Sequence, residues 1–268
     1  MNRDDMIMMA EKFIQNAPEN YISDEVALHP RYVGMKIYDA PIFAFGSVDD
    51  ELYTKYKSFD VIGNHFLSPA EWLSNTKTVI SFFLPYTDKI KAANAKDCLW
   101  PAEEWLHGRY EGQTVLKLLS EYLVKSISES GFKSLIPTHD QRYKTGNAEI
   151  KNTSNWSERH IAYACGLGTF GLSKGIITKK GMSGRLGSIL TELDLPKDNR
   201  AYKDIREHCA MCGLCIDRCP VRAISMEDGK NASSCSDFLG KVLEKYKPRY
   251  GCGKCQVNVP CESEIPMK

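Results

Sequence analysis

Four cysteines lie close together in the stretch HCAMCGLCIDRCP of this chain of 268 residues. Two residues separate Cys209 from Cys212 and Cys212 from Cys215, and three more lead to Cys219, which Pro220 follows. Three thiolates at this spacing can occupy three corners of one iron–sulfur cube, whereas the fourth is carried away by a turn of helix and usually ligates another cluster. The spacing therefore predicts 4Fe–4S clusters whose other ligands come from elsewhere in the chain.

Further cysteines downstream provide enough thiolates for two 4Fe–4S clusters. By the logic of bacterial ferredoxins, we predict one cluster on Cys209, Cys212, Cys215 and Cys261, and the other on Cys219, Cys235, Cys252 and Cys255. Zinc is the alternative, but structural zinc favours paired C-x2-C knuckles, and this triple run leaves one cysteine over. The two remaining cysteines, Cys98 and Cys165, are interpreted as small buried apolar residues.

A glycine-rich stretch, GLGTFG at residues 166–171, matches the pattern G-x-G-x-x-G. A dinucleotide site would place this pattern after a strand and before a helix, but here it follows a predicted helix. Glycine lets the backbone approach a flat cofactor closely, so we predict cofactor contacts at Gly166, Gly168 and Gly171. Lys174 belongs to a basic group after this loop, which either forms a solvated turn or contacts an anionic part of the cofactor.

The elements that must position these residues alternate between helices and strands, which predicts an α/β (α+β) fold. Helices are expected at about residues 4–15, with Asp4 or Asp5 as the cap, and at about 111–129. A buried strand is expected at 77–86 and a second strand at 134–139. Asn155 with Glu158 resembles a capping box and predicts a helix that ends at Gly166.

Two more strands are expected after the glycine loop, GIIT and GSILTEL, around the turn KKG. The polar stretch 194–204 resembles a linker and is taken as the boundary between two domains, residues 1–200 and residues 201–268.

Composition predicts a cytoplasmic protein. The formal net charge is +1, which gives no electrostatic case for binding nucleic acid or an anionic membrane. The N-terminal residues lack the uninterrupted apolar run of a signal peptide, and the longest apolar stretch, TVISFFLPY, is too short to span a bilayer. Cysteines in such a setting indicate metal binding rather than disulfides.

Three blocks of the sequence, taken together, resemble the cobalamin-dependent epoxyqueuosine reductases and, more distantly, the reductive dehalogenases. They are SPAEWLSNTKTVISFFLPY, then ERHIAYACGLGTFGLSKGIIT with GRLGSILTELDLP, and then the cluster-binding tail with Cys235 and YGCGKCQ. The resemblance implies a nitroreductase-like N-terminal domain followed by a small ferredoxin-like domain with two clusters. It also implies a corrinoid, cobalamin, in the first domain with one cluster close to it.

The chain departs from this family at the proton donor. Alignment of Glu158-Arg159 with the family's Glu-Arg pair places Asn152 where the family has a catalytic aspartate, and an amide cannot deliver that proton. His160, Tyr143 and Tyr163 are the candidate replacements. The last cysteine also follows after a longer gap, and the chain stops soon after it, without the helical repeats that help the family to hold tRNA.

The resulting prediction is a redox enzyme. Electrons from a low-potential donor of the ferredoxin or flavodoxin type would enter the cluster that contains Cys219 and pass to the cluster that contains Cys209. The corrinoid near residues 166–171 would then reduce a small-molecule substrate, and nucleic acid is not expected as a partner. The alternatives are an electron-transfer or cofactor-handling protein without its own substrate, and a flavin-dependent reductase.

Overall fold

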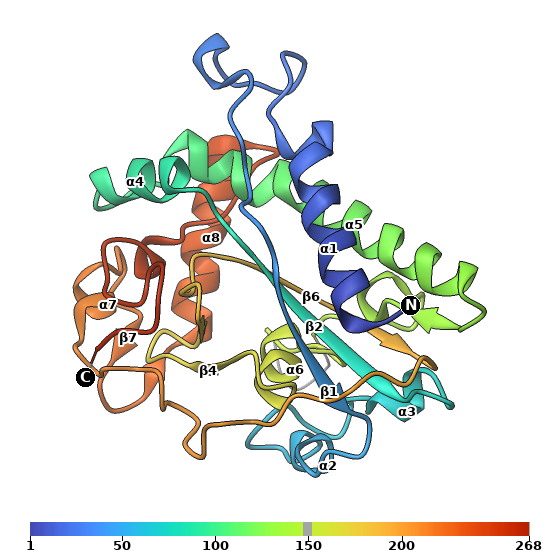
Figure 1. Cartoon of the computed structure of the whole chain (residues 1–268). Helices are drawn as coiled ribbons and strands as arrows, with labels where there is room; N and C mark the ends of the chain where they lie inside the picture. Colours follow the sequence, from blue (N-terminus) through green and yellow to red (C-terminus); the bar gives the residue numbers. More distant parts are fainter. Residues whose placement is uncertain (147–151, 268) are drawn as a thin grey trace.

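An antiparallel sheet of four strands forms the centre of the computed structural model, which describes residues 1–146 and 152–267 (Figure 1). The strand order is β1 (Ile42–Ser47), β2 (Thr78–Pro85), β6 (Gly184–Thr191) and β3 (Ser134–Leu135). Two short hairpins lie outside this sheet: β4 (Gly168–Phe170) pairs with β5 (Ile176–Thr178), and β7 (Ile224–Ser225) pairs with β8 (Gly229–Lys230).

Strand β2 lies between two hydrophobic cores, one on each face of the sheet, and all of its residues are buried. Side chains alternate between the faces of a strand. Ile80 and Phe82 accordingly enter one hydrophobic core with α1 (Arg3–Asn16) and α5 (Glu103–Glu129). Val79 and Phe83 enter a second core with α2 (Leu52–Tyr56), α3 (Pro69–Trp72) and α6 (Glu158–Ala164). The continuous apolar run that predicted this strand therefore reflects burial on both faces.

The predicted helices are present, with corrections at their starts. In α1 the cap is Asn2 rather than Asp4 or Asp5, because the Asn2 side chain accepts a hydrogen bond from the Asp5 backbone N–H and the Asp5 carboxylate accepts one from the Asn2 backbone N–H. Helix α5 begins at Glu103 rather than near residue 111, and its added first turns bury Trp105 and Leu106. Among the described residues, no helix is long and apolar enough to cross a membrane.

The capping box predicted for α6 is wrong. Ser157 occupies the N-cap position, while the Asn155 side chain binds the backbone of Lys144 and Arg142 at 2.9 and 2.8 Å. The helix ends as expected, with Gly166 at a φ of 89°. The two strands expected after the glycine loop exist as β5 and β6, but β5 pairs with β4 and β6 pairs with β2.

The cysteine-rich segment packs against the α/β part through α4 (Asp88–Lys96) and α5. Helix α8 (Ala232–Tyr246) places Phe238 and Val242 in a third core with Leu106. Two hydrogen bonds join α4 to the segment around Cys252. Asn94 Nδ2 on α4 donates to the Cys252 carbonyl at 3.0 Å, and Lys254 Nζ donates to the Asn94 carbonyl at 2.7 Å. The stretch 194–204 carries no helix or strand.

Candidate iron–sulfur and substrate site

Four cysteine side chains line one cavity beside the short helix α7 (Leu214–Asp217): Cys209, Cys212, Cys215 and Cys261. We call this the first cysteine cavity. Gly213 begins α7 with a φ of 77°, which glycine adopts readily. Burial, followed by the charges of Cys209 and Cys215, raises the pKa of the Cys261 thiol to about 12. Thiolates held together in this way need a cationic centre to neutralise them, and binding of iron would supply it.

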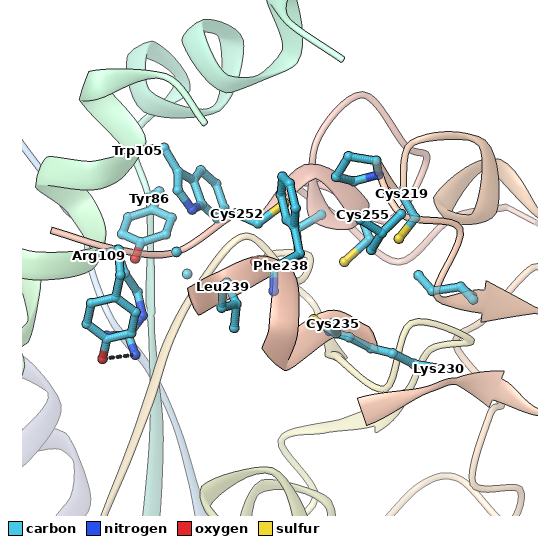
Figure 2. Close-up of a pocket in the computed structure, with 18 of the residues that line it drawn as sticks. Tyr86, Trp105, Arg109, Cys219, Lys230, Cys235, Phe238, Leu239, Cys252 and Cys255 are labelled. Carbon is cyan, nitrogen blue, oxygen red and sulfur yellow. Dashed lines mark hydrogen bonds between the residues drawn. The ribbon is translucent and has the colours of Figure 1, made fainter. Parts of the chain in front are cut away.

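The other four cysteines of the predicted partition line a second cysteine cavity: Cys219, Cys235, Cys252 and Cys255 (Figure 2). Cys235 lies on α8, Cys252 lies in the loop after it, and Cys255 lies in the short 3-10 helix Lys254–Gln256. Burial, followed by the charge of Cys255, raises the pKa of the Cys252 thiol to about 12. Burial, followed by the charge of Cys255, raises the pKa of Cys215 in the first set to about 12, so the two sets are close enough to interact.

The arrangement of both sets is compatible with iron–sulfur cubes. A zinc ion requires its sulfur ligands to converge to about 2.3 Å from one point. Across residues 1–146 and 152–267, no group of three His, Cys, Asp or Glu side chains is placed to hold a single metal ion. Thiolates arranged around a cavity, rather than around a point, fit a cluster of several atoms.

A third cavity lies over β6 between α5 and the start of α6, and we call it the β6 cavity. Its polar wall includes Tyr143, Glu158, Arg185 and Ser188, and Leu116 contributes to its apolar wall. Arg185 also lines the second cysteine cavity, so one residue of β6 reaches both spaces.

Two polar atoms at the β6 cavity are buried without partners. Among the described residues, Glu158 Oε2 and Arg185 Nε have no hydrogen-bond partner. Burial raises the pKa of Glu158 from 4.5 to about 7, and Ser188, Trp156 and Arg185 lower it in part. Buried polar atoms are normally satisfied, so this arrangement indicates a place for a ligand.

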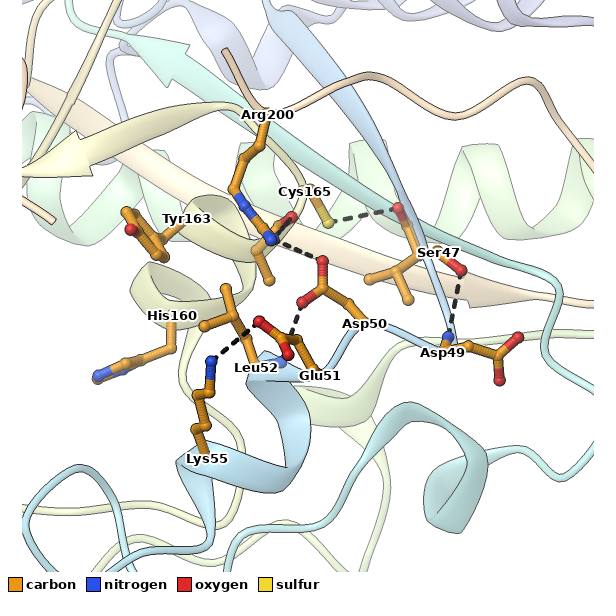
Figure 3. Close-up of polar contacts among 12 residues, drawn as sticks. Ser47, Asp49, Asp50, Glu51, Leu52, Lys55, His160, Tyr163, Cys165 and Arg200 are labelled. Carbon is orange, nitrogen blue, oxygen red and sulfur yellow. Dashed lines mark hydrogen bonds and ion pairs between the residues drawn. The ribbon is translucent and has the colours of Figure 1, made fainter. Parts of the chain in front are cut away.

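Helix α6 is fixed at its other end, which holds Glu158 in place. Arg200 donates to the carbonyl of Ala164 at 2.9 Å and pairs with Asp50, as Figure 3 shows.

Cys165 is buried beside this pair and donates to the Val79 carbonyl at 3.5 Å, as expected of a structural cysteine. The same prediction for Cys98 is wrong, because Cys98 is exposed.

Of the three predicted proton donors, only Tyr143 lines the β6 cavity. His160 lies outside all three cavities, packed against Tyr56 and Phe170. Burial, followed by the charge of Arg159, lowers the pKa of His160 to about 4, so it carries no proton to give at neutral pH. The ring of Tyr163 lies 5.1 Å from that of Tyr202, also outside the cavities. These positions argue against His160 and Tyr163 as donors.

The structure gives two glycines of the loop at residues 166–171 a role in the fold itself, whereas the sequence predicted contacts with a cofactor. An added Cβ at Gly168 would lie 2.3 Å from the Ile177 carbonyl oxygen, so this glycine permits close pairing of β4 with β5. Gly166 provides the left-handed turn after α6. Gly171 lines the first cysteine cavity, and Lys174 is an exposed residue with a φ of 59°. Cofactor binding by these four residues stays a prediction.

The sequence interpretation missed Glu158 and Arg185 as site residues. Glu158 stands at the first position of a helix, where an acidic residue is ordinarily a favourable charge beside the helix dipole. Arg185 belongs to the basic group that follows the glycine loop, for which the sequence left open a solvated turn or contact with an anionic part of a cofactor. The local sequence could not distinguish a surface role from a role in the site for these two residues, because their positions at the cavity depend on the pairing of β6 with β2. Asn152, aligned with the family's aspartate, is exposed.

Together, fold and site define an iron–sulfur protein in which a cysteine-rich segment packs on an α/β domain. Residues 202–225 match the family model described as "4Fe-4S binding domain". The resemblance to the epoxyqueuosine reductases is confirmed: a relative of that name from Bacillus anthracis is 26% identical over 213 residues, which cover 72% of this chain and 50% of the relative. Another, from Leadbetterella byssophila, is 27% identical over 219 residues, which cover 75% of this chain and 65% of the relative. The chain thus spans about half to two thirds of the length of these relatives.

Solved structures show the same fold. The epoxyqueuosine reductase from Streptococcus thermophilus has a TM-score of 0.54 at 18% identity, with 100% of this chain and 69% of that chain covered. A reductive dehalogenase linked in its description to B12-dependent dehalogenation has a TM-score of 0.55 at 13% identity, with 97% of this chain and 38% of that chain covered. The mixed α/β architecture is therefore confirmed, while the nitroreductase-like assignment stays a prediction.

Proposed function

We propose that this chain is a corrinoid-dependent reductase that carries two 4Fe–4S clusters. A donor of the ferredoxin or flavodoxin type would supply low-potential electrons, and a substrate would be reduced in the β6 cavity. The observation that carries the proposal is the position of Arg185, which lines both a cavity surrounded by four cysteines and a cavity with unsatisfied polar atoms. An electron carrier needs the first of these spaces but has no use for the second.

The order of the clusters in this proposal is opposite to the order expected from the sequence. Cys212, in the first set, is exposed, which suits entry of electrons from a partner protein. The second set adjoins Arg185 and therefore lies nearer to the β6 cavity. Electrons would pass from the set with Cys209 to the set with Cys219 and then toward the substrate.

The walls of the β6 cavity suit a large, mostly apolar ring with polar substituents. Leu116, Ile136 and Leu186 offer apolar contact, while Arg185 and Ser188 offer hydrogen-bond donors. When bound there, a corrinoid would supply two-electron reduction at its cobalt. The protein's part would be to hold the ring, to exclude water and to bring the electrons close.

The substrate class follows from the relatives and is also a proposal. One similar structure is described as an epoxyqueuosine reductase with an epoxyqueuosine-modified tRNA stem loop, at a TM-score of 0.55, 17% identity, and coverage of 99% of this chain and 66% of that chain. This finding weighs against the expectation, drawn from net charge, that nucleic acid is no partner. An epoxyqueuosine-modified stem loop is therefore the first substrate to test.

Cluster content provides the first prediction. Protein purified without oxygen should contain about eight iron atoms and as many acid-labile sulfides per chain, because each cube has four of each. Elemental analysis and sulfide assay measure both. Zinc without sulfide would contradict the iron–sulfur assignment, and about four irons would mean that one cysteine set binds no cluster.

Retention of cobalamin provides the second prediction. Reconstituted protein passed through a sizing column after incubation with cobalamin should keep about one cobalt per chain. Gln113 is exposed at the rim of the β6 cavity on α5, and Lys117 is exposed four residues further along, outside the cavity. Gln113→Trp should reduce retention at least tenfold because its ring would narrow the entrance, whereas Lys117→Trp should retain cobalamin like the wild type.

The same experiment separates the alternatives. Retention of flavin instead of cobalamin would support a flavin-dependent reductase. Retention of neither, with both clusters present, would support an electron-transfer protein. Equal retention by both tryptophan variants would place the corrinoid outside the β6 cavity.

A further inference from the structure

The carboxyl group of Glu158 lies at the β6 cavity with one buried oxygen that lacks a hydrogen-bond partner among the described residues. The side chain lines the cavity from the first position of α6. Its Oε2 atom is buried, and none of residues 1–146 or 152–267 gives it a hydrogen bond. A buried carboxylate oxygen without a partner is costly, and the cost is relieved if that oxygen carries a proton that it can give to a ligand.

The groups around Glu158 come from several elements. Arg185 on β6 brings a positive charge and Ser188 a hydroxyl; Tyr143 and His139 line the cavity from the segment after β3. The lining residues on α5, Gln113, Leu116 and Ser120, are uncharged. Cys165, at the end of α6, is a buried thiol whose pKa burial raises, so it stays neutral. Hydrogen bonds with Ser188 and Trp156, followed by the charge of Arg185, offset part of the effect of burial, which raises the pKa of Glu158 to about 7.

We propose that Glu158 is the proton donor to the substrate in the β6 cavity, the role that Asn152 cannot fill. This inference rests on the proposed function, because it requires a substrate that is reduced in that cavity. An acid is most effective when its pKa lies near the working pH, since it then holds a proton and also releases it readily. Neither Asn152 nor the neutral His160 meets this requirement.

The proposed step balances as follows. The low-potential donor loses two electrons through the clusters, and the substrate gains this pair while the bond to its leaving group breaks. The leaving group departs as an anion, the O–H bond of Glu158 breaks, and the proton moves to that anion. Arg185 opposes the charge of the resulting carboxylate. Solvent supplies the second proton and then restores the proton of Glu158.

Infrared spectroscopy tests the proton itself without any turnover. The chain of residues 1–268, titrated from pH 5 to pH 9, should show a protonated-carboxyl band that disappears with a midpoint near 7. Glu158→Gln should lack this band. Glu129→Gln, which changes an exposed carboxyl at the end of α5, should keep it. Absence of the band from the wild type, or its persistence in Glu158→Gln, would overturn the proposal.

Turnover tests the use of that proton. With clusters and cobalamin loaded and an epoxyqueuosine-modified tRNA stem loop as the probe, single-turnover rates should fall at least 100-fold in Glu158→Gln and remain unchanged in Glu129→Gln. Wild-type rates should decline above pH 7, and Glu158→Asp should recover part of the loss. Equal rates in wild type and Glu158→Gln would overturn the proposal while leaving the proposed function intact.

Failure of the loaded wild type to reduce the stem loop would count against the proposed substrate. In that case the infrared titration alone decides the state of Glu158, so the two failures remain distinguishable. Iron and cobalt content of each variant, measured beforehand, shows whether Glu158→Gln has kept its fold and cofactors.

Discussion

Replacement of Cys219 by alanine is expected to remove the same cluster as replacement of Cys235, although Cys219 follows Cys215 within one short run of sequence. The structure places Cys219 with Cys235, Cys252 and Cys255 around the second cysteine cavity. A cube that loses one of its four thiolates is left with an open iron site and is expected to be lost during purification. Iron content should fall from about eight to about four per chain in either variant.

Electron paramagnetic resonance of the reduced protein identifies which cluster remains. Cys219→Ala and Cys235→Ala should leave one and the same signal, and Cys261→Ala should leave the complementary one. Cys98→Ala is the matched control, because Cys98 is exposed and lies outside both cavities, so it should keep all of its iron. Loss of the same cluster in Cys219→Ala and Cys209→Ala would show that the grouping into two sets is wrong.

Gly253→Ala is expected to destabilise the protein by about 3 kcal/mol, since two separate costs add. An added Cβ would lie 1.9 Å from Cζ2 of Trp105, a buried ring that packs edge-on against Tyr86. Gly253 also has a φ of 63°, which favours glycine. Because Gly253 lies between Cys252 and Cys255, movement of this loop should also release the second cluster.

Thermal unfolding followed by circular dichroism, together with iron content, measures both effects. Gly34→Ala is the control: Gly34 has a comparable φ of 75°, and an added Cβ would meet nothing within 4 Å. This variant should cost only about 1 kcal/mol, for backbone strain, and should keep all of its iron. Similar losses in the two variants would assign the effect to backbone conformation and not to Trp105.

Local signals in the sequence predicted a large part of the fold. Strand β2 is a run of β-branched and aromatic residues, and most of α5 repeats apolar residues at helical spacing, so each pattern is complete within one segment. Ligand spacing in ferredoxins also predicted two sets of cysteines, and the same two sets line the two cysteine cavities. Cluster binding by each set stays a prediction.

Strand pairing between residues far apart in the sequence could not be predicted from local patterns. Strand β6 pairs with β2 across about a hundred residues, and this pairing brings Arg185 to two cavities. The burial of Glu158 follows from the same contact, whereas the local sequence showed only an acidic residue at a helix start. The order of the two clusters that we propose rests on these tertiary contacts, and it therefore differs from the order expected from the sequence.

Hydrogen bonds between the cysteine loops and the α/β part indicate whether residues 1–200 could fold as a separate fragment. Ser183, at the entrance to β6, donates to the carbonyl of Gln256, and Asn94 of α4 exchanges bonds with Cys252 and Lys254. The backbone around Glu262 also fills the space beside Gly181, where an added Cβ would lie 2.3 Å from the Glu262 carbonyl oxygen. A fragment ending at residue 200 would lose these partners and expose the buried side of α4 and of Trp105. We therefore expect the two predicted domains to fold as one unit, with the ferredoxin-like part supporting the sheet.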